Sequence, residues 1–251
     1  MNRSIIALAL LTLGSSVVAE EASFSERIKA TMAAEIRTEA DTERDRNRKP
    51  VETLEFLQIH NGMRVLELFP GRGWYTKLLA PALRENGEYL VALGTRRIKE
   101  SLIGQPGFDQ VKLLDPGAET KPSDMRSVND IGEFSFGVEG LDAVLTFRNM
   151  HNFTPAGRGN INQAVFQALR PGGLYGVVDH TRRHNDPLTM ESRRRVDPVV
   201  MIKELLDAGF EFVDHSALHY RPDDELRYEV GRKTVTGNTD RFTFLFRKRE
   251  G

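Results

Sequence analysis

From residue 50 onward, short apolar runs alternate with segments of helical periodicity, and this alternation most limits the possible folds. The apolar runs cover 63–68, 89–93, 111–114, 141–147, 174–178, 210–213 and 241–246, and helical patterns cover 74–84, 161–169 and 196–208. Apolar strands separated by helices are typical of a parallel sheet with helices on both faces. The sequence therefore predicts an α/β fold, in which the polar segment 115–140 is irregular.

The N-terminus has the three parts of an export signal. Arg3 precedes a mostly apolar run at 5–13, and small residues follow as far as Ala19. That run is far shorter than the ~20 residues that span a bilayer. We therefore expect residues 1–19 to be a signal peptide cleaved near Ala19, which predicts a periplasmic or secreted protein with no stable membrane insertion. The alternatives are an uncleaved anchor and a misassigned start.

Charge and composition exclude several kinds of site. The chain has 35 Lys and Arg against 36 Asp and Glu, so no basic excess recruits nucleic acid. Because cysteine is absent, disulfides, thiolate zinc sites, iron–sulfur clusters and a cysteine nucleophile are excluded. His180 and His184 lie four residues apart in a predicted loop without a clear third ligand, so we expect no metal ion.

A highly charged segment precedes the alternating pattern. Ile28, Met32 and Ile36 form a narrow helical stripe in it, and Pro50 ends it. We predict a charged helical arm over 20–50, followed by one domain over 51–251. Two interpretations of the arm are open: a solvated helix face, or a cover that packs over the mouth of a site and contributes an arginine.

The junction between the first strand and its helix carries the functional motif. Gly71 and Gly73 follow the strand in Glu67-Leu68-Phe69-Pro70-Gly71-Arg72-Gly73-Trp74. Open α/β sheets bind ligands at the carboxyl ends of their strands, where glycine lets the backbone come close and helix N–H groups favour an anion. Glu67 can accept from an ammonium group. A dinucleotide site needs a third glycine where Thr76 stands, which disfavours a nicotinamide-dependent oxidoreductase.

This motif and six further segments resemble a group of bacterial predicted methyltransferases with exported N-termini, within the class I S-adenosylmethionine-dependent superfamily. The further segments are 48–54, 146–152, 169–173, 177–180, 195–198 and 237–242, and the resemblance covers roughly 44–249. It implies a Rossmann-like sheet, mostly parallel with an antiparallel last strand, and S-adenosyl-L-methionine as cofactor. The candidate cofactor contacts are Glu67, Phe69, Pro70, Gly71, Gly73, Trp74 and Asp115.

Two positions depart from the pattern of the class. Phe69-Pro70 stands where many members carry glycine, which stiffens the loop. The second strand ends in Leu93-Gly94-Thr95 instead of the acidic residue that usually binds the ribose hydroxyls, so these hydroxyls need another acceptor. Asp115, after the third strand, is one candidate for that acceptor. Its alternative role is to form a turn before Pro116-Gly117.

Candidates for chemistry follow the fourth and fifth strands. Asn149 and His151 lie at the carboxyl edge, where a neutral imidazole can take a proton from a methyl acceptor. The alternative for His151 is a hydrogen-bonded loop histidine. The basic segment 180–197 is either a solvated loop or a lid that binds an acidic substrate through guanidinium groups. Its arginines are Arg182, Arg183, Arg193, Arg194 and Arg195.

We therefore expect an S-adenosylmethionine-dependent methyltransferase that acts on a small molecule, with an acidic substrate as one option and no nucleic acid as partner. The alternative is a non-catalytic ligand-binding protein that keeps the same fold. Export constrains the first hypothesis, because the permanent charges of S-adenosylmethionine prevent unaided passage through a bilayer. The cofactor must then be loaded before export or supplied outside the cytoplasm. The sequence leaves the oligomeric state open.

Overall fold

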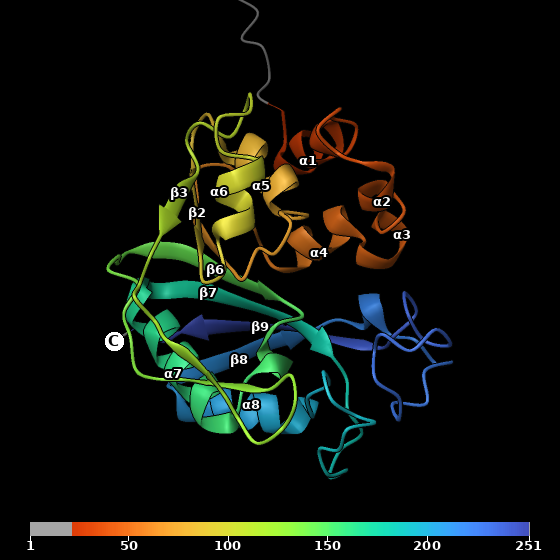
Figure 1. Cartoon of the computed structure of the whole chain (residues 1–251). Coiled ribbons are helices and arrows are strands. Elements are labelled where there is room, and N and C mark those ends of the chain that lie inside the picture. Colours follow the sequence, from red (N-terminus) through yellow and green to blue (C-terminus); the bar gives the residue numbers. More distant parts are fainter. Residues whose placement is uncertain (1–21, 251) are drawn as a thin grey trace, which may run out of the picture.

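A central sheet with helices on both faces forms the body of the molecule (Figure 1). The computed structural model describes residues 22–250, so the predicted signal peptide at 1–19 lies outside the described residues. The helices are α1 (Phe24–Met32), α2 (Glu39–Thr42), α3 (Asp45–Arg48), α4 (Pro50–Phe56), α5 (Thr76–Leu83), α6 (Arg96–Ser101), α7 (Pro155–Ala168) and α8 (Pro198–Asp207), with short 3-10 turns η1 (Met150–Asn152) and η2 (Ala217–His219). Within 22–250, no helix is both long enough and apolar enough to cross a membrane.

The large sheet has seven strands in the order β3-β2-β1-β6-β7-β9-β8. The strands are β1 (Arg64–Leu68), β2 (Glu88–Ala92), β3 (Lys112–Leu114), β6 (Leu141–Phe147), β7 (Leu169–His180), β8 (Phe210–His215) and β9 (Arg241–Lys248). From β3 to β7 all pairings are parallel, whereas β9 runs antiparallel to both β7 and β8. The predicted α/β fold with an antiparallel last strand is confirmed.

Alternation along the strands divides the core between the two faces of the sheet. In β1, Val65 points into the core formed with α1, α4 and α5, and Leu66 and Leu68 point into the core formed with α7 and α8. All three side chains are fully buried. Because the strands are covered on both faces, they appear in the sequence as continuous apolar runs.

The charged arm packs into the protein. Ile28 is 1% exposed and joins the α5 core, and the partly buried Met32 and Ile36 pack against the same core. The predicted stripe therefore faces the core, but the arm is broken into three short helices. The backbone at Lys49 is left-handed, with φ 41°, and this turn ends α3 just before Pro50 begins α4.

Two regions were not recognised in the sequence. Helix α6 follows β2 in a segment without helical periodicity, because Ile98 is its only buried side chain. The segment 115–140 contains a small antiparallel hairpin of β4 (Thr120–Pro122) and β5 (Asn129–Ile131). The strands of this hairpin have three residues each and are mostly polar, so they give little periodic signal.

The basic segment 180–197 is largely tied to the protein, which corrects the lid interpretation for two of its arginines. Arg195 is 1% exposed and forms a bidentate pair with Asp224, at 2.8 and 3.0 Å. It also donates to the carbonyl oxygens of Tyr228 and Thr181. Arg194 pairs with Glu229. Arg195 is thus a structural cation that anchors the segment to the loop before β9.

Removing the charge of Arg195 should strongly destabilise the fold. In Arg195→Met, Asp224 keeps a buried charge without its partner, so we expect the free energy of unfolding to fall by roughly 3–5 kcal/mol. The matched control is Lys203→Met on α8, where the pair with Asp207 is 73% and 62% exposed. That change should stay within about 0.5 kcal/mol. Urea denaturation of both variants measures the difference, and equal stabilities would contradict the structural role of Arg195.

Candidate functional site

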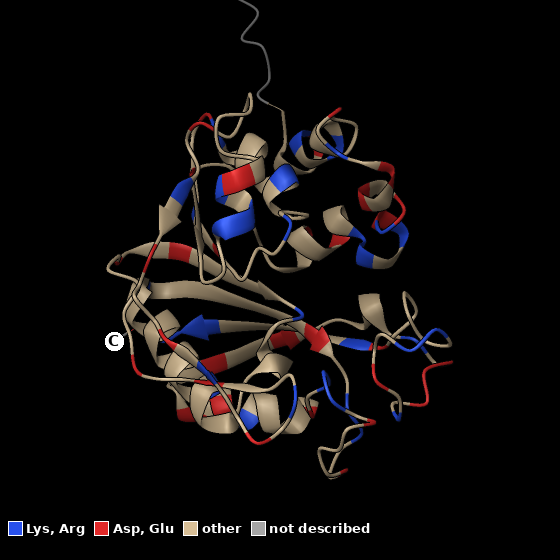
Figure 2. Ribbon diagram, in the orientation of Figure 1, with Lys and Arg blue, Asp and Glu red and all other residues tan. Residues whose placement is uncertain are grey.

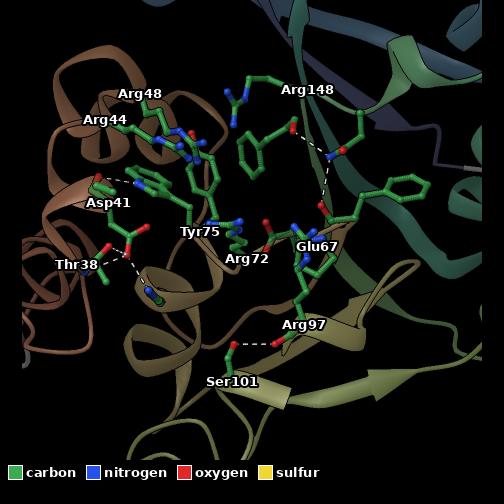
Figure 3. A pocket seen from close by; sticks show the side chains of 18 of the residues that line it. Thr38, Asp41, Arg44, Arg48, Glu67, Arg72, Tyr75, Arg97, Ser101 and Arg148 are labelled. Carbon is green, nitrogen blue, oxygen red and sulfur yellow. Dashed lines mark hydrogen bonds and ion pairs between the residues drawn. The ribbon is translucent and has the colours of Figure 1, made fainter. Parts of the chain in front are cut away.

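Two adjoining cavities lie at the carboxyl ends of β1, β6 and β7. The first chamber, of about 610 Å³, lies between the loop after β1, helix α6 and the arm. The second chamber, of about 480 Å³, lies between the arm, the ends of β6 and β7, and the segment before β9. Arg44, Arg48 and Arg148 line both chambers. Figure 3 shows Arg44 and Arg48 on the arm and Arg148 across from them.

The backbone turns out of the sheet in a left-handed conformation at three strand ends. The φ angles are 53° at Phe69, 63° at Leu93 and 64° at Arg148, which follow β1, β2 and β6. This region costs a non-glycine residue roughly 1–2 kcal/mol. Phe69 therefore has a backbone conformation that favours glycine, the residue that many methyltransferases of the class carry at this position. The Asn149 amide donates to the carbonyl oxygens of Phe69 and Phe147, at 3.3 and 2.9 Å, and joins two of these turns.

Gly71 and Gly73 have different roles. Both have positive φ, 62° and 78°. Gly71 lines the first chamber, and a Cβ there would meet only the Phe69 carbonyl oxygen, at 4.0 Å. A Cβ on Gly73 would lie 2.6 Å from Leu102 and 2.9 Å from Ile98. Gly71 therefore leaves room for a ligand, whereas Gly73 allows α6 to pack against the loop, and a larger residue at 73 would disturb the fold itself.

Glu67 is a buried carboxylate at the floor of the first chamber. Oε2 accepts from the Thr76 hydroxyl at 2.8 Å and from the Tyr89 hydroxyl. Burial raises the pKa of the Glu67 carboxyl to about 7, although both hydroxyl bonds favour its ionised form. Among the described residues nothing donates to Oε1, so one carboxylate oxygen is left for a ligand cation in the chamber.

Trp74 connects the motif to the arm. Its Nε1 donates to the Asp41 carbonyl oxygen at 2.8 Å, and the Arg48 guanidinium lies 4.3 Å from its ring centroid. Tyr75 beside it stacks on Phe147 at 3.6 Å between ring centroids. These rings form the wall between the sheet and the arm. The arm is therefore the cover that the second interpretation expected, and it brings arginines to the site.

His151 forms a buried pair with Asp179. The distance from His151 Nδ1 to Asp179 Oδ1 is 2.5 Å, and the other carboxylate oxygen accepts from the His151 backbone N–H at 3.0 Å. A carboxylate only accepts, so Nδ1 carries the proton and Nε2 is the basic nitrogen. His151 lines the second chamber beside His180. Burial, together with His151 and Arg148, lowers the pKa of His180 well below its usual value, so His180 stays neutral.

The structure gathers most of the predicted site residues. Those that line the first chamber are Glu67, Phe69, Pro70, Gly71, Trp74 and Asn149, and His151 lines the second. Gly73 and Asp115 line neither chamber. The exposed Asp115 accepts from the Gly117 backbone N–H at 3.2 Å, which is the turn-forming role named as its alternative. Within 22–250, no group of three or more potential ligands could hold a metal ion.

Several lining residues were missed in the sequence. Arg44, Arg48, Arg148 and Arg241 come from the arm, the end of β6 and the start of β9, so no local spacing connects them. Arg48 and Arg148 stand inside segments that carried the resemblance, where they received no role. Glu100 of α6 also lines the first chamber. Its carboxylate is mostly exposed and lies 3.3 Å from the Arg96 guanidinium, one turn earlier on the same helix.

Solved structures share this fold. A SAM-dependent methyltransferase from Aquifex aeolicus matches with a TM-score of 0.57 at 14% identity, covering 89% of this chain and 98% of that one. The 1,6-didemethyltoxoflavin-N1-methyltransferase of Burkholderia thailandensis, solved with S-adenosylhomocysteine, matches at 0.51 and 15%, covering 90% and 88%. The [4+2]-cyclase SpnF matches at 0.53 and 15%, covering 84% and 82%. The chain thus has the fold of these methyltransferases, which a cyclase also uses.

Sequence comparison gives a partial match. An uncharacterized methyltransferase of Synechocystis sp. is 31% identical over 134 residues, which is 53% of this chain and 54% of the relative. The chain therefore spans about half the length of the curated relative that it matches. No protein-family model matches the chain.

Glu67 predicts a pH dependence of stability. Burial raises its pKa to about 7 in the fold, well above the usual value of a glutamate, so the folded state holds the proton more tightly. Stability from this group is fully present below the unfolded pKa and is lost as pH rises through the folded pKa. Relative to Glu67→Gln, which cannot ionise, the wild-type free energy of unfolding should fall by roughly 3 kcal/mol between about pH 4 and pH 8.

Urea denaturation at intervals of pH compares the two proteins. The difference between them isolates this carboxyl, because every other titrating group is common to both. If the two stability curves run parallel across this range, Glu67 is already ionised in the fold and the explanation by burial is wrong.

Proposed function

We propose that this protein is an S-adenosylmethionine-dependent methyltransferase that acts on a small-molecule acceptor. The first chamber would hold the cofactor and the second chamber the acceptor. The observation that carries this proposal is that His151, which is paired with the buried Asp179, lines a cavity that adjoins the glycine-motif cavity. The fold shared with methyltransferases and the partial sequence match support it.

The residues of the first chamber fit the cofactor. The free Oε1 of Glu67 suits the ammonium group, and Gly71 leaves space beside the backbone. Arg72 and Arg48 line the chamber and suit the carboxylate, and Glu100 suits the ribose hydroxyls. When bound there, S-adenosylmethionine supplies an electrophilic methyl group on a positively charged sulfur.

His151 would act as the general base. Asp179 fixes the ring and stabilises the imidazolium that forms when Nε2 takes a proton. An acceptor hydroxyl would give its proton to Nε2 while its oxygen lone pair forms the bond to the methyl carbon. The electron pair of the broken carbon–sulfur bond would stay on sulfur, so the products would be the methylated acceptor and S-adenosylhomocysteine. Asn149 is a positioning residue that holds the loop after β1 in place.

The alternative of a non-catalytic binding protein has no specific observation in its favour. A pure binding site has no need for a buried carboxylate that fixes the tautomer of a cavity-lining histidine. The predicted signal peptide extends the proposal to an exported enzyme, which would carry its cofactor with it or meet it outside the cytoplasm. A start near Glu20 in the protein from its native cell, read by mass spectrometry, would support export.

Binding of the cofactor tests the proposal directly. Calorimetric titration of the purified protein with S-adenosylmethionine and S-adenosylhomocysteine should show one site for each. Gly71→Val should abolish binding, because the new side chain enters the first chamber. Gly117→Val is the matched control, since its φ is also 62° and its Cβ meets nothing within 4 Å. The control should bind as the wild type does. A wild-type protein with no affinity at millimolar concentration would refute the proposal.

The His151–Asp179 pair predicts a spectroscopic and a kinetic result. Nitrogen NMR should show the Nδ1–H tautomer of His151, and Asp179→Asn should disturb it. With a methylatable acceptor, His151→Ala should lower kcat by roughly 10²–10⁴-fold with little change in cofactor affinity. His215→Ala is the control, because that exposed histidine on β8 lines neither chamber. Full activity in His151→Ala would leave this residue a structural histidine.

A further inference from the structure

Four arginines line the second chamber, and within residues 22–250 none of them forms an ion pair with a carboxylate. Arg44, Arg48, Arg148 and Arg241 all line it. Arg48 is 5% exposed and Arg241 is 6% exposed, and the Nε of Arg241 is buried without any hydrogen-bond partner. Figure 2 shows the basic segments of α3 and of the start of β9 on the same side of the molecule.

The acidic groups nearby are already engaged. Asp179 accepts from His151 and from the His180 backbone N–H, and Asp240 accepts from the Arg221 backbone N–H. Among the described residues that line the second chamber there is no Asp or Glu. A fifth lining arginine, Arg194, is paired with Glu229. The second chamber therefore carries an excess of positive charge.

Burying this charge has a cost that a ligand can offset. Burial, with Arg148 nearby, lowers the pKa of Arg48 to about 9, and burial with Arg148 lowers the pKa of Arg241 to about 10. Arg241 donates one hydrogen bond to the Asn47 carbonyl oxygen, at 2.7 Å, but neither Arg48 nor Arg241 forms an ion pair with a carboxylate among the described residues. Burying these two guanidinium groups without a direct ion pair is unfavourable. A bound anion would replace the hydrogen bonds to water that these guanidinium groups lose on burial, through charge-assisted hydrogen bonds of its own.

The backbone conformation of Arg148 also favours contact with a bound anion. Its left-handed φ of 64° directs the side chain from the end of β6 toward Arg44 and Arg48 (Figure 3). Backbone strain of this kind persists where the surrounding structure holds it, and it concentrates at functional sites. His151 lines the same chamber.

We propose that the second chamber binds a small organic anion, a carboxylate or phosphate, through Arg44, Arg48, Arg148 and Arg241. As the substrate class of the methyltransferase, which rests on the proposed function, this means an acceptor anchored by its anionic group while its hydroxyl lies at His151. The cofactor carboxylate alone does not account for the cluster, because Arg241 lines only the second chamber.

Titrations with simple probes test the anion site without knowledge of the acceptor. Benzoate and phenyl phosphate are compared with neutral benzamide and cationic benzylamine by calorimetry, with and without S-adenosylhomocysteine. Both anions should bind at least about 10-fold more tightly than benzamide, since a hydrogen bond to a charged group contributes about 1.5–3 kcal/mol. The two anionic probes separate carboxylate from phosphate preference.

Variants locate the site. Arg148→Met should weaken anion binding by about 10- to 100-fold. Arg44→Met, an exposed arginine without a side-chain partner among the described residues, should weaken it by about 2- to 5-fold and leave the fold intact. Arg84→Met is the control, because Arg84 pairs with Asp109 and lines neither chamber. It should bind as the wild type does.

The outcomes separate the two proposals. Equal binding of benzoate, phenyl phosphate and benzamide, or anion binding unchanged in both Arg148→Met and Arg44→Met, overturns the anion site. If S-adenosylhomocysteine binds while the anions do not, only the anion site fails. If the anions bind in the Arg148-dependent manner and S-adenosylhomocysteine does not, the anion site stands and the methyltransferase proposal fails.

Discussion

The rest of the site depends on how the chain leaves the sheet at the switch point between β1 and β6. After β1 the chain crosses to β2 on one side, and after β6 it crosses to β7 on the other, which opens a crevice at the carboxyl edge. Both exits use a left-handed residue, Phe69 and Arg148, and the Asn149 amide joins the two turns. The first turn forms the floor of the first chamber, and the second directs an arginine across both chambers.

The arm covers the open side of the crevice. A crevice at a sheet edge is open to water, and the arm closes it by packing Arg48 over the ring of Trp74. The aromatic face partly compensates the desolvated guanidinium, and the pair between Lys77 and Asp41, at 2.7 Å, fixes the arm to α5. His219, in the segment before β9, adds a further contact to the arm, since its Nε2 lies 3.1 Å from the Arg48 carbonyl oxygen. The arm therefore forms one wall of each chamber.

The sequence predicted what is encoded locally. The strands appear as apolar runs because both faces of the sheet are buried, and the glycine motif and His151 lie at strand ends that the same pattern locates. Helix α6 gave no signal because it buries only Ile98. The cationic cluster could not be predicted, since Arg48, Arg148 and Arg241 meet only after the sheet and arm have formed.

Arg195 was misinterpreted for a related reason. A run of basic residues looks the same in sequence whether its charges face solvent or, as with Asp224, a buried carboxylate.

The charge of the two chambers couples their proposed ligands. In the proposed complex, the positive sulfur of the cofactor would lie beside a second chamber in which Arg44, Arg148 and Arg241 form no ion pair among the described residues, so these charges would repel each other. An anion in the second chamber reverses the sign of that interaction, so each ligand would favour the binding of the other. In the proposed reaction, methyl transfer would remove the positive charge from sulfur while the arginines keep theirs. The attraction between the two ligands would then be lost in the product state, which would favour release after the chemistry and not before it.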